Sequence, residues 1–287
     1  MSELEASEPG GRSGVVVASA EATAATGEPP SGDVLSLQGL NVLRGGRTVV
    51  RNVSIDITAG EVTALLGPNG AGKSSLVLAV AGVLRPESGS VLLDGRDLAG
   101  SRPERVRRAG VAVVPEGRRL LSELTVDDNI RVATYALSRE QARAGRERAL
   151  ELFPALKKCL KVPARALSGG EQQMVVLAQA LVSEPRFVFI DELSLGLAPV
   201  VIRRLIPVIR TMAESGIGVL LIEQFAAIAL GLARRAYVME GGQLRYSGLA
   251  TELVENPALL HSAYLLASSG GSGAAAAAPG AHDPRGS

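Results

Sequence analysis

Residues 67–74 read Gly-Pro-Asn-Gly-Ala-Gly-Lys-Ser and match the pattern G-x-x-x-x-G-K-[ST] at every required position. The apolar run 62–66 before them predicts a buried strand, and a helix is predicted from Ser74 to Val83. The glycines let several backbone N–H groups converge on one oxyanion, and the positive end of the helix faces the same point. The sequence therefore predicts a phosphate-binding loop, in which Lys73 reaches the phosphates and Ser74 is a ligand for Mg²⁺.

A pair of acidic residues, Asp191 and Glu192, follows a second predicted strand over residues 187–190. The carboxyl ends of strands in an open α/β sheet face the ligand crevice, so both carboxylates are expected near the loop at 67–74. Asp191 is expected to hold Mg²⁺, directly or through water, and Glu192 to be the base that positions and deprotonates an attacking water. An acidic pair alone is equally typical of a helix cap or turn, and the loop upstream favours the catalytic interpretation.

A Ser-Gly-Gly turn at residues 168–170 precedes a helix predicted over residues 171–182. By its chemistry this turn is a second helix N-terminus suited to an anion. One phosphate-binding loop needs only one such cradle for its own nucleotide. The second is interpreted as completing the nucleotide site of a neighbouring chain, with an ordinary N-capped helix as the alternative.

The remaining pattern alternates strands and helices, which predicts a mostly parallel sheet covered on both faces. Pro207 falls inside one predicted helix and is expected to kink it. The other predicted strands are 91–93, 111–114, 217–222 and 237–239, and the other predicted helices are 126–137, 139–153 and 199–215.

In this order, the loop, the Ser-Gly-Gly turn and the Asp-Glu strand resemble the ATP-binding subunit of an ABC transporter over residues 34–267. The resemblance implies an α/β fold: a P-loop NTPase core with a mostly parallel sheet, an N-terminal antiparallel β portion and an inserted helical subdomain. It also implies a head-to-tail dimer, in which residues 168–171 close over the ATP of the partner and residues 194–199 touch that partner. The implied boundaries are 34–97 and 168–250 for the nucleotide-binding core, 98–167 for the helical subdomain and 251–267 for a C-terminal helix.

The resemblance also implies which residues form the site. Catalysis is expected from Lys73, Glu192 and Gln224, and Mg²⁺ is expected to be held by Ser74, Asp191 and Glu116. ATP is expected to contact Arg44, Gly67, Pro68, Asn69, Gly70, Ala71, Gly72, Lys73, Ser74, Ser75 and Glu116, and, on the partner's nucleotide, Ser168, Gly169, Gly170 and Glu171.

Finer features resemble the branched-chain amino acid importer branch of this family: the stretches 114–119, 124–129, 194–199 and 262–265, and the pair Glu223-Gln224. In that branch Glu116 stands at the Q-loop position and Gln224 at the usual switch histidine. Gln224 cannot take up a proton, so it would orient water or contact the γ-phosphate, with a polar strand-end cap as the alternative.

Two residues depart from the family pattern. Arg44 stands where an aromatic side chain often stacks on adenine; a guanidinium can also stack on a base, and an exposed loop arginine is the alternative. Leu193 replaces the proline that commonly follows the catalytic glutamate, and a local effect on turn stiffness is expected.

The composition of the chain limits the kinds of molecule that it is expected to bind. The 287 residues carry 30 Lys+Arg against 29 Asp+Glu, and this near-neutral balance argues against nucleic acid as the main partner. The longest apolar stretches, 217–222 and 225–233, fall short of the roughly 20 residues that cross a membrane. The chain is therefore not expected to span a membrane itself. The resemblance implies a place at the cytoplasmic face of the membrane, with separate integral membrane permease subunits, a second ATP-binding subunit and an extracytoplasmic solute-binding protein. Residues 1–33 and 268–287 are predicted to be disordered tails.

Two other functions are weighed. One is a soluble ABC ATPase that acts on ribosomes or DNA, although neither a second nucleotide module nor a long coiled-coil insertion is found. The other is a catalytically silent half of a heterodimer, against which the intact Lys73, Asp191, Glu192 and Ser168 speak. The solute, the direction of transport beyond the resemblance, and the choice between homodimer and heterodimer do not follow from the sequence.

Overall fold

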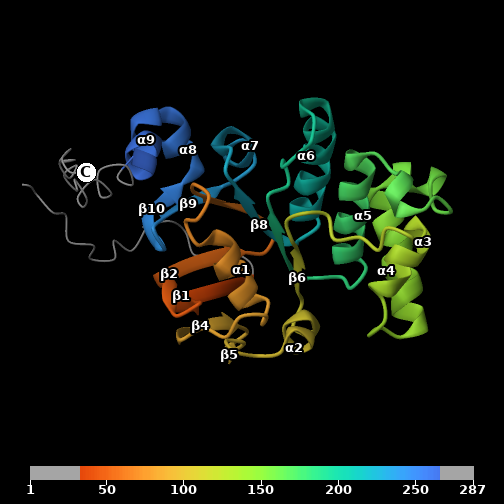
Figure 1. The fold of residues 1–287 in the computed structure, drawn as a ribbon, viewed down its shortest axis with the longest axis horizontal. Helices are drawn as coiled ribbons and strands as arrows, with labels where there is room; N and C mark the ends of the chain where they lie inside the picture. The colour runs from red at the N-terminus through yellow and green to blue at the C-terminus, as the bar shows by residue number, and fades with distance from the viewer. Residues whose placement is uncertain (1–32, 266–287) are drawn as a thin grey trace, which may run out of the picture.

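The computed structural model describes residues 33–265, which form two sheets and the helices around them (Figure 1). The larger sheet has the strand order β10-β9-β3-β8-β7-β6. Its inner strands β3, β7 and β8 are buried at every residue, as expected for a sheet covered on both faces. All neighbours pair parallel except β10, which is antiparallel to β9. The strands are β3 (Val62–Leu66), β6 (Val111–Val114), β7 (Phe187–Asp191), β8 (Gly218–Glu223), β9 (Arg235–Glu240) and β10 (Gln243–Leu249).

The smaller sheet is antiparallel and lies in the N-terminal part, in the order β2-β1-β4-β5. Helix α1 (Lys73–Val80) lies beside β1 and β2, and its apolar residues share one core cluster with both sheets (Figure 1). The start of α1 is thereby fixed between the two sheets. The strands are β1 (Val34–Arg44), β2 (Arg47–Thr58), β4 (Ser88–Leu93) and β5 (Arg96–Asp97). The fold is thus α/β with the predicted antiparallel portion.

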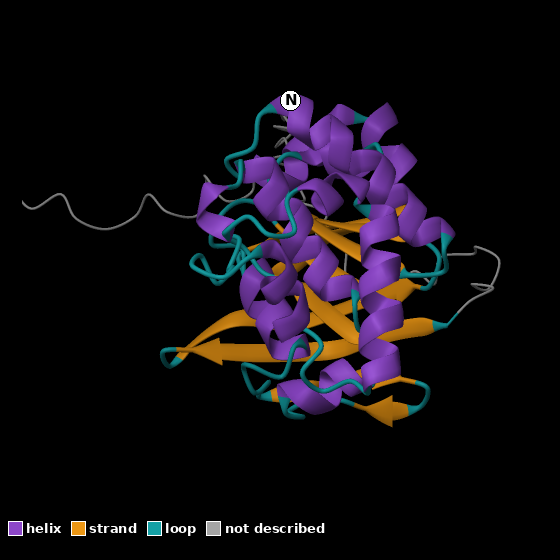
Figure 2. Cartoon of the chain, turned by 90° about the vertical axis from the view of Figure 1, so that its right-hand side faces the viewer, coloured by secondary structure: helices purple, strands orange, loops and turns teal. Residues whose placement is uncertain are grey.

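The second core cluster joins the other face of the parallel sheet to helices. In Figure 1, α3, α4 and α5 group at one end and α8 and α9 at the other, and Figure 2 shows an upper part that is almost entirely helical. The helices are α2 (Pro103–Arg108), α3 (Val126–Val132), α4 (Arg139–Leu152), α5 (Gly169–Leu181), α6 (Pro199–Glu214), α7 (Ala226–Leu230), α8 (Ala250–Glu255) and α9 (Pro257–Leu265), with 3₁₀ turns η1 (Pro154–Lys158) and η2 (Ala164–Ala166).

Several predicted helix ends are wrong, each for a local reason. Helix α1 ends at Val80 rather than Val83, because Gly82 adopts a φ of 75° and the amide of Val83 bonds back to the carbonyl of Leu78. Helix α3 ends at Val132 rather than at residue 137, because the backbone bonds that follow join each amide to the carbonyl three residues before it, as in Thr134 to Arg131. Helix α5 starts at Gly169, two residues before the predicted position.

Where one helix is predicted over 251–267, the structure has α8 and α9, separated at Asn256. Pro257 disfavours helical backbone at the residue before it, and Asn256 has φ −124° and ψ 81°. Helix α6 continues through Pro207. The predicted tails 1–33 and 268–287 lie outside the described residues, apart from Asp33. Within the described range, no helix is long and apolar enough to cross a membrane.

Candidate functional site

The loop at residues 67–72 connects β3 to α1, and its first two carbonyls accept hydrogen bonds from Lys73, the first residue of that helix. The ammonium of Lys73 is buried and donates to the carbonyls of Gly67 at 2.8 Å and Pro68 at 3.0 Å. Burial lowers the pKa of Lys73, while the carboxylates of Glu192 and Asp191 oppose this shift. A positive charge is thus held at the mouth of the loop, where the predicted phosphates would lie.

Two glycines of the loop are required by close approach of other backbone. A Cβ atom on Gly67 would lie 2.1 Å from the carbonyl oxygen of Met239 in β9. A Cβ atom on Gly72, whose φ is 104°, would lie 2.3 Å from the carbonyl oxygen of Val49 in β2. Both distances are far below contact distance, so the loop is packed between the two sheets.

Asp191 ends β7 and is buried beside α1. The Ser74 hydroxyl forms a hydrogen bond with its carboxylate, while Oδ1 is buried with no hydrogen-bond partner among the described residues. Burial raises the pKa of Asp191, and the Ser74 hydrogen bond opposes that shift. An orphaned buried carboxylate oxygen beside a hydroxyl is a donor set that fits a hard divalent cation such as Mg²⁺.

Glu192 follows β7 with a φ of 52°, the left-handed region that a side chain rarely adopts. Its amide donates to the carbonyl of Ile222 in β8 at 3.0 Å, which holds this conformation against the sheet. The side chain of the next residue, Leu193, is fully buried in the core. The chain therefore turns sharply at Glu192 while Leu193 anchors it.

Lys73, Ser74 and Glu192 meet in a pocket of about 430 Å³, whereas Asp191 lines a second pocket that shares Glu192 and Leu195 with the first. Val49 and Leu195, which the sequence did not suggest as ligand contacts, also line it. Gly67 and Pro68 contribute carbonyls to Lys73, and Ala71 is buried, its carbonyl accepting from the amide of Gly242. The predicted site residues that line the pocket are Arg44, Asn69, Gly70, Gly72, Lys73, Ser74, Ser75, Glu116 and Glu192.

The Ser-Gly-Gly turn does not line this pocket, although the structure describes all of residues 168–171. Ser168 caps α5, and the Glu171 carboxylate accepts from the Ser168 amide at 2.8 Å and hydroxyl at 2.7 Å. The carboxylate of Glu171 is thereby used by its own helix. A Cβ atom on Gly170 would lie 2.6 Å from Val201 of α6, so this glycine serves helix packing.

Gln224 also lies outside the lining of the pocket, as an exposed residue directly after β8. Two residues close to Glu192 were missed as site residues. Glu223 is buried and accepts two hydrogen bonds from Ser194, and the guanidinium of Arg118 donates to the carbonyls of Leu195 and Gly196. A carboxylate at the end of an apolar parallel strand was the available signal for Glu223, and Arg118 had none.

A family model described as ABC transporter matches residues 50–194. The chain is 38% identical over 224 residues to the Pseudomonas aeruginosa high-affinity branched-chain amino acid transport ATP-binding protein BraG, covering 78% of this chain and 96% of that one. It is 32% identical to the lipopolysaccharide export system ATP-binding protein LptB of Acidithiobacillus ferridurans, covering 78% and 94%. A nucleotide-free ATP-binding cassette from an ABC transporter matches the fold with a TM-score of 0.72, at 24% identity, over 79% of this chain and 97% of that chain.

Proposed function

The chain belongs to the ABC transporter family, as an ATP-binding and ATP-hydrolysing subunit with membrane permease partners, and we propose that it powers the import of branched-chain or related amino acids. The observation that carries the proposal is the pocket that gathers Lys73, Ser74, Glu116 and Glu192. The relative of 38% identity is named for branched-chain amino acid transport, and this supports the solute class. Export is the second candidate, because a relative of 32% identity is named for lipopolysaccharide export.

We propose the following roles for the side chains. Lys73 and the backbone amides of the loop bind the β- and γ-phosphates, and Arg44, which lines the same pocket, stacks on the base. Ser74 and Asp191, with Glu116 on the pocket wall, would hold Mg²⁺, which when bound neutralises charge on the phosphates. Glu192 takes a proton from the attacking water, whose oxygen bonds to the γ-phosphorus as the bond to the bridging oxygen breaks and ADP leaves. We infer that Gln224 orients this water.

A second ATP-binding chain completes the site in this proposal. The Ser168 turn lies outside the pocket of its own chain, and we infer that this helix N-terminus faces a partner's ATP. Leu195, on the pocket wall, and Val200, in the first turn of α6, expose 49% and 48% of their surface, as expected of residues that a partner covers. A head-to-tail dimer places both features against the second chain.

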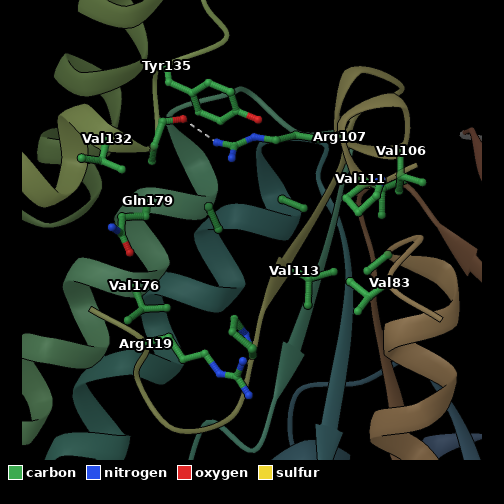
Figure 3. Close-up of a pocket in the computed structure, with 16 residues that line it drawn as sticks. Val83, Val106, Arg107, Val111, Val113, Arg119, Val132, Tyr135, Val176 and Gln179 are labelled. Atoms are coloured by element: carbon green, nitrogen blue, oxygen red, sulfur yellow. Dashed lines mark hydrogen bonds between the residues drawn. The ribbon is translucent and has the colours of Figure 1, made fainter. Parts of the chain in front are cut away.

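A second groove, on the wall of which the loop of Glu116 also lies, supports the contact with the permease (Figure 3). It has a volume of about 400 Å³ and lies between β6, the end of α1 and the helical region of α3 and α5. Val83, Val132 and Tyr135 on its wall expose 59%, 47% and 70% of their surface, which is typical of a protein interaction site. Arg119 also lines the groove and belongs to the same loop as Glu116, so one loop joins the groove to the nucleotide pocket.

Replacing Val132 by Asp is expected to abolish co-purification of the permease subunits from gently solubilised native membranes, while ATP binding is unchanged. A charge in the groove must be desolvated when the apolar surface is covered. The tagged chain is isolated with its partners, which are identified by mass spectrometry. Val254→Asp is the matched control, because Val254 is 57% exposed on α8, at the opposite end of the molecule (Figure 1).

Stoichiometric permeases with the wild type and the control, and their loss with Val132→Asp, is the expected pattern. Recovery of ribosomal or DNA-associated proteins alone by the wild type would contradict the transporter proposal. Undiminished permease with Val132→Asp would contradict the assignment of the groove.

A further inference from the structure

Glu223 is a buried carboxylate that the hydrolysis steps above do not use. It ends β8, exposes 1% of its surface and directly precedes Gln224. Burial raises its pKa, the hydrogen bonds from Ser194 oppose that shift, and the carboxylates of Glu192 and Asp191 add to it. Apolar surroundings and neighbouring like charges both disfavour an ionised carboxylate at this position, so the presence of Glu223 there indicates a specific structural or functional role.

The partner of Glu223 is Ser194, two residues after Glu192 along the chain. The Ser194 amide donates to one carboxylate oxygen at 3.0 Å and the Ser194 hydroxyl donates to the other at 2.7 Å. Both hydrogen bonds are buried, and Ser194 itself is buried. The two oxygens of Glu223 therefore grip a single residue at two points.

These two hydrogen bonds help to hold the chain in place on both sides of Glu192. On one side the Glu192 amide is bonded to the carbonyl of Ile222, and on the other Ser194 is bonded to Glu223, the next residue of the same strand. Between these two anchors the chain holds its left-handed φ of 52° at Glu192. A strained backbone conformation persists only where the surroundings over-determine it.

We propose that Glu223 is a positioning residue for hydrolysis: its bidentate grip on Ser194 fixes the turn that aims the Glu192 carboxylate into the nucleotide pocket. The same two hydrogen bonds fix Ser194, the first residue of the segment 194–199, which includes the exposed Leu195. Glu223 thus links the base to that segment and to Gln224 through one carboxylate. This inference rests on the proposed ATPase role of Glu192.

The test compares Glu223→Ala, Glu223→Gln and Ser194→Ala in the full chain assembled with its membrane partners, with kcat and KM for ATP as the readout. Glu223→Ala removes both hydrogen bonds, and kcat is expected to fall about 10- to 100-fold, since small misplacements of a catalytic group are costly. KM for ATP is expected to stay within about twofold, because the loop at 67–74 is not gripped by Glu223.

The conservative variant supplies the rescue. In Glu223→Gln the amide oxygen still accepts from the Ser194 amide, and the NH₂ group donates to the Ser194 hydroxyl, so the grip survives without charge. Its kcat is expected to stay within about threefold of the wild type. Ser194→Ala keeps only the backbone bond and is expected to give an intermediate loss, about 3- to 10-fold.

Ser215→Ala is the matched control, because it deletes a hydroxyl hydrogen bond of the same 2.7 Å length, to Met212 at the end of α6. Its kcat is expected to be that of the wild type. Wild-type kcat in Ser194→Ala would overturn the inference even where Glu223→Ala fails to fold. Equal losses in Glu223→Gln and Glu223→Ala would also overturn it. Failure of the wild type to hydrolyse ATP would instead refute the proposed function.

Discussion

Replacement of Glu192 by Gln is expected to lower ATP turnover by about 10²- to 10⁴-fold, the usual contribution of a general base. The amide keeps the size and the hydrogen-bonding reach of the side chain, but it cannot accept a proton from water. Because Lys73, Ser74 and the loop amides are untouched, ATP binding is expected to persist. Two chains should then remain closed around unhydrolysed ATP, which size-exclusion chromatography with ATP and Mg²⁺ would detect as a stable dimer.

Glu184→Gln is the matched control for this substitution. Glu184 is the same residue type in the same left-handed conformation, with a φ of 50° against 52° for Glu192. Its carboxylate is exposed and paired with Arg148 rather than lining the nucleotide pocket. Turnover in Glu184→Gln should equal that of the wild type. Wild-type turnover in Glu192→Gln would remove Glu192 from the role of base.

Replacing Lys73 by Ala is expected to weaken ATP binding about 10- to 150-fold. The side chain supplies a charge-assisted hydrogen bond to phosphate, and such bonds are worth about 1.5 to 3 kcal/mol each. The substitution also leaves the carbonyls of Gly67 and Pro68 without their donor, so the loop loses its internal closure. Isothermal titration calorimetry with ATP measures the change in affinity directly.

A second variant separates the effect of the Lys73 charge from that of its side-chain packing, and a third variant is the control. Lys73→Met keeps the buried aliphatic stem, and it should lose ATP affinity about as much as Lys73→Ala. Lys157→Ala removes an exposed ammonium from the 3₁₀ turn η1 and should bind ATP as the wild type does. Unchanged affinity in both Lys73 variants would contradict the assignment of the loop at 67–74 to the nucleotide.

The parts of the fold that could be predicted are those encoded by local pattern. The strand, loop and helix around Lys73 were predicted because apolar run, glycines and lysine stand in one short stretch. The capping boxes at Ser138 and Ser168 are encoded by the spacing of each serine to the Gln141 or Glu171 that follows it, so they can be predicted from the sequence. The early end of α1 was also encoded, by Gly82, and was overlooked.

Other features could not be predicted because they depend on how distant segments meet. The grip of Glu223 on Ser194 joins residues 29 positions apart, on neighbouring strand ends. The contact of Arg118 with Leu195 and Gly196 spans more than 70 residues, and Arg118 itself has a φ of 44°. Neither hydrophobic periodicity nor a short motif predicts a contact between residues so far apart in the sequence. The positions of Asp191 and Glu192 could be predicted, because the carboxyl ends of strands in an open α/β sheet face the ligand crevice.

The most direct test of the proposed function is solute uptake into proteoliposomes that contain this chain and its co-purified permeases, with ATP and Mg²⁺ in the lumen and the solute-binding protein that we propose for this system added outside. Radiolabelled leucine, isoleucine or valine supplied outside is expected to accumulate inside with the wild-type chain and to stay outside with Glu192→Gln. ATP hydrolysis without uptake of any of the three, accompanied by movement of a lipid or polysaccharide in the opposite direction, would contradict import and favour an exporter.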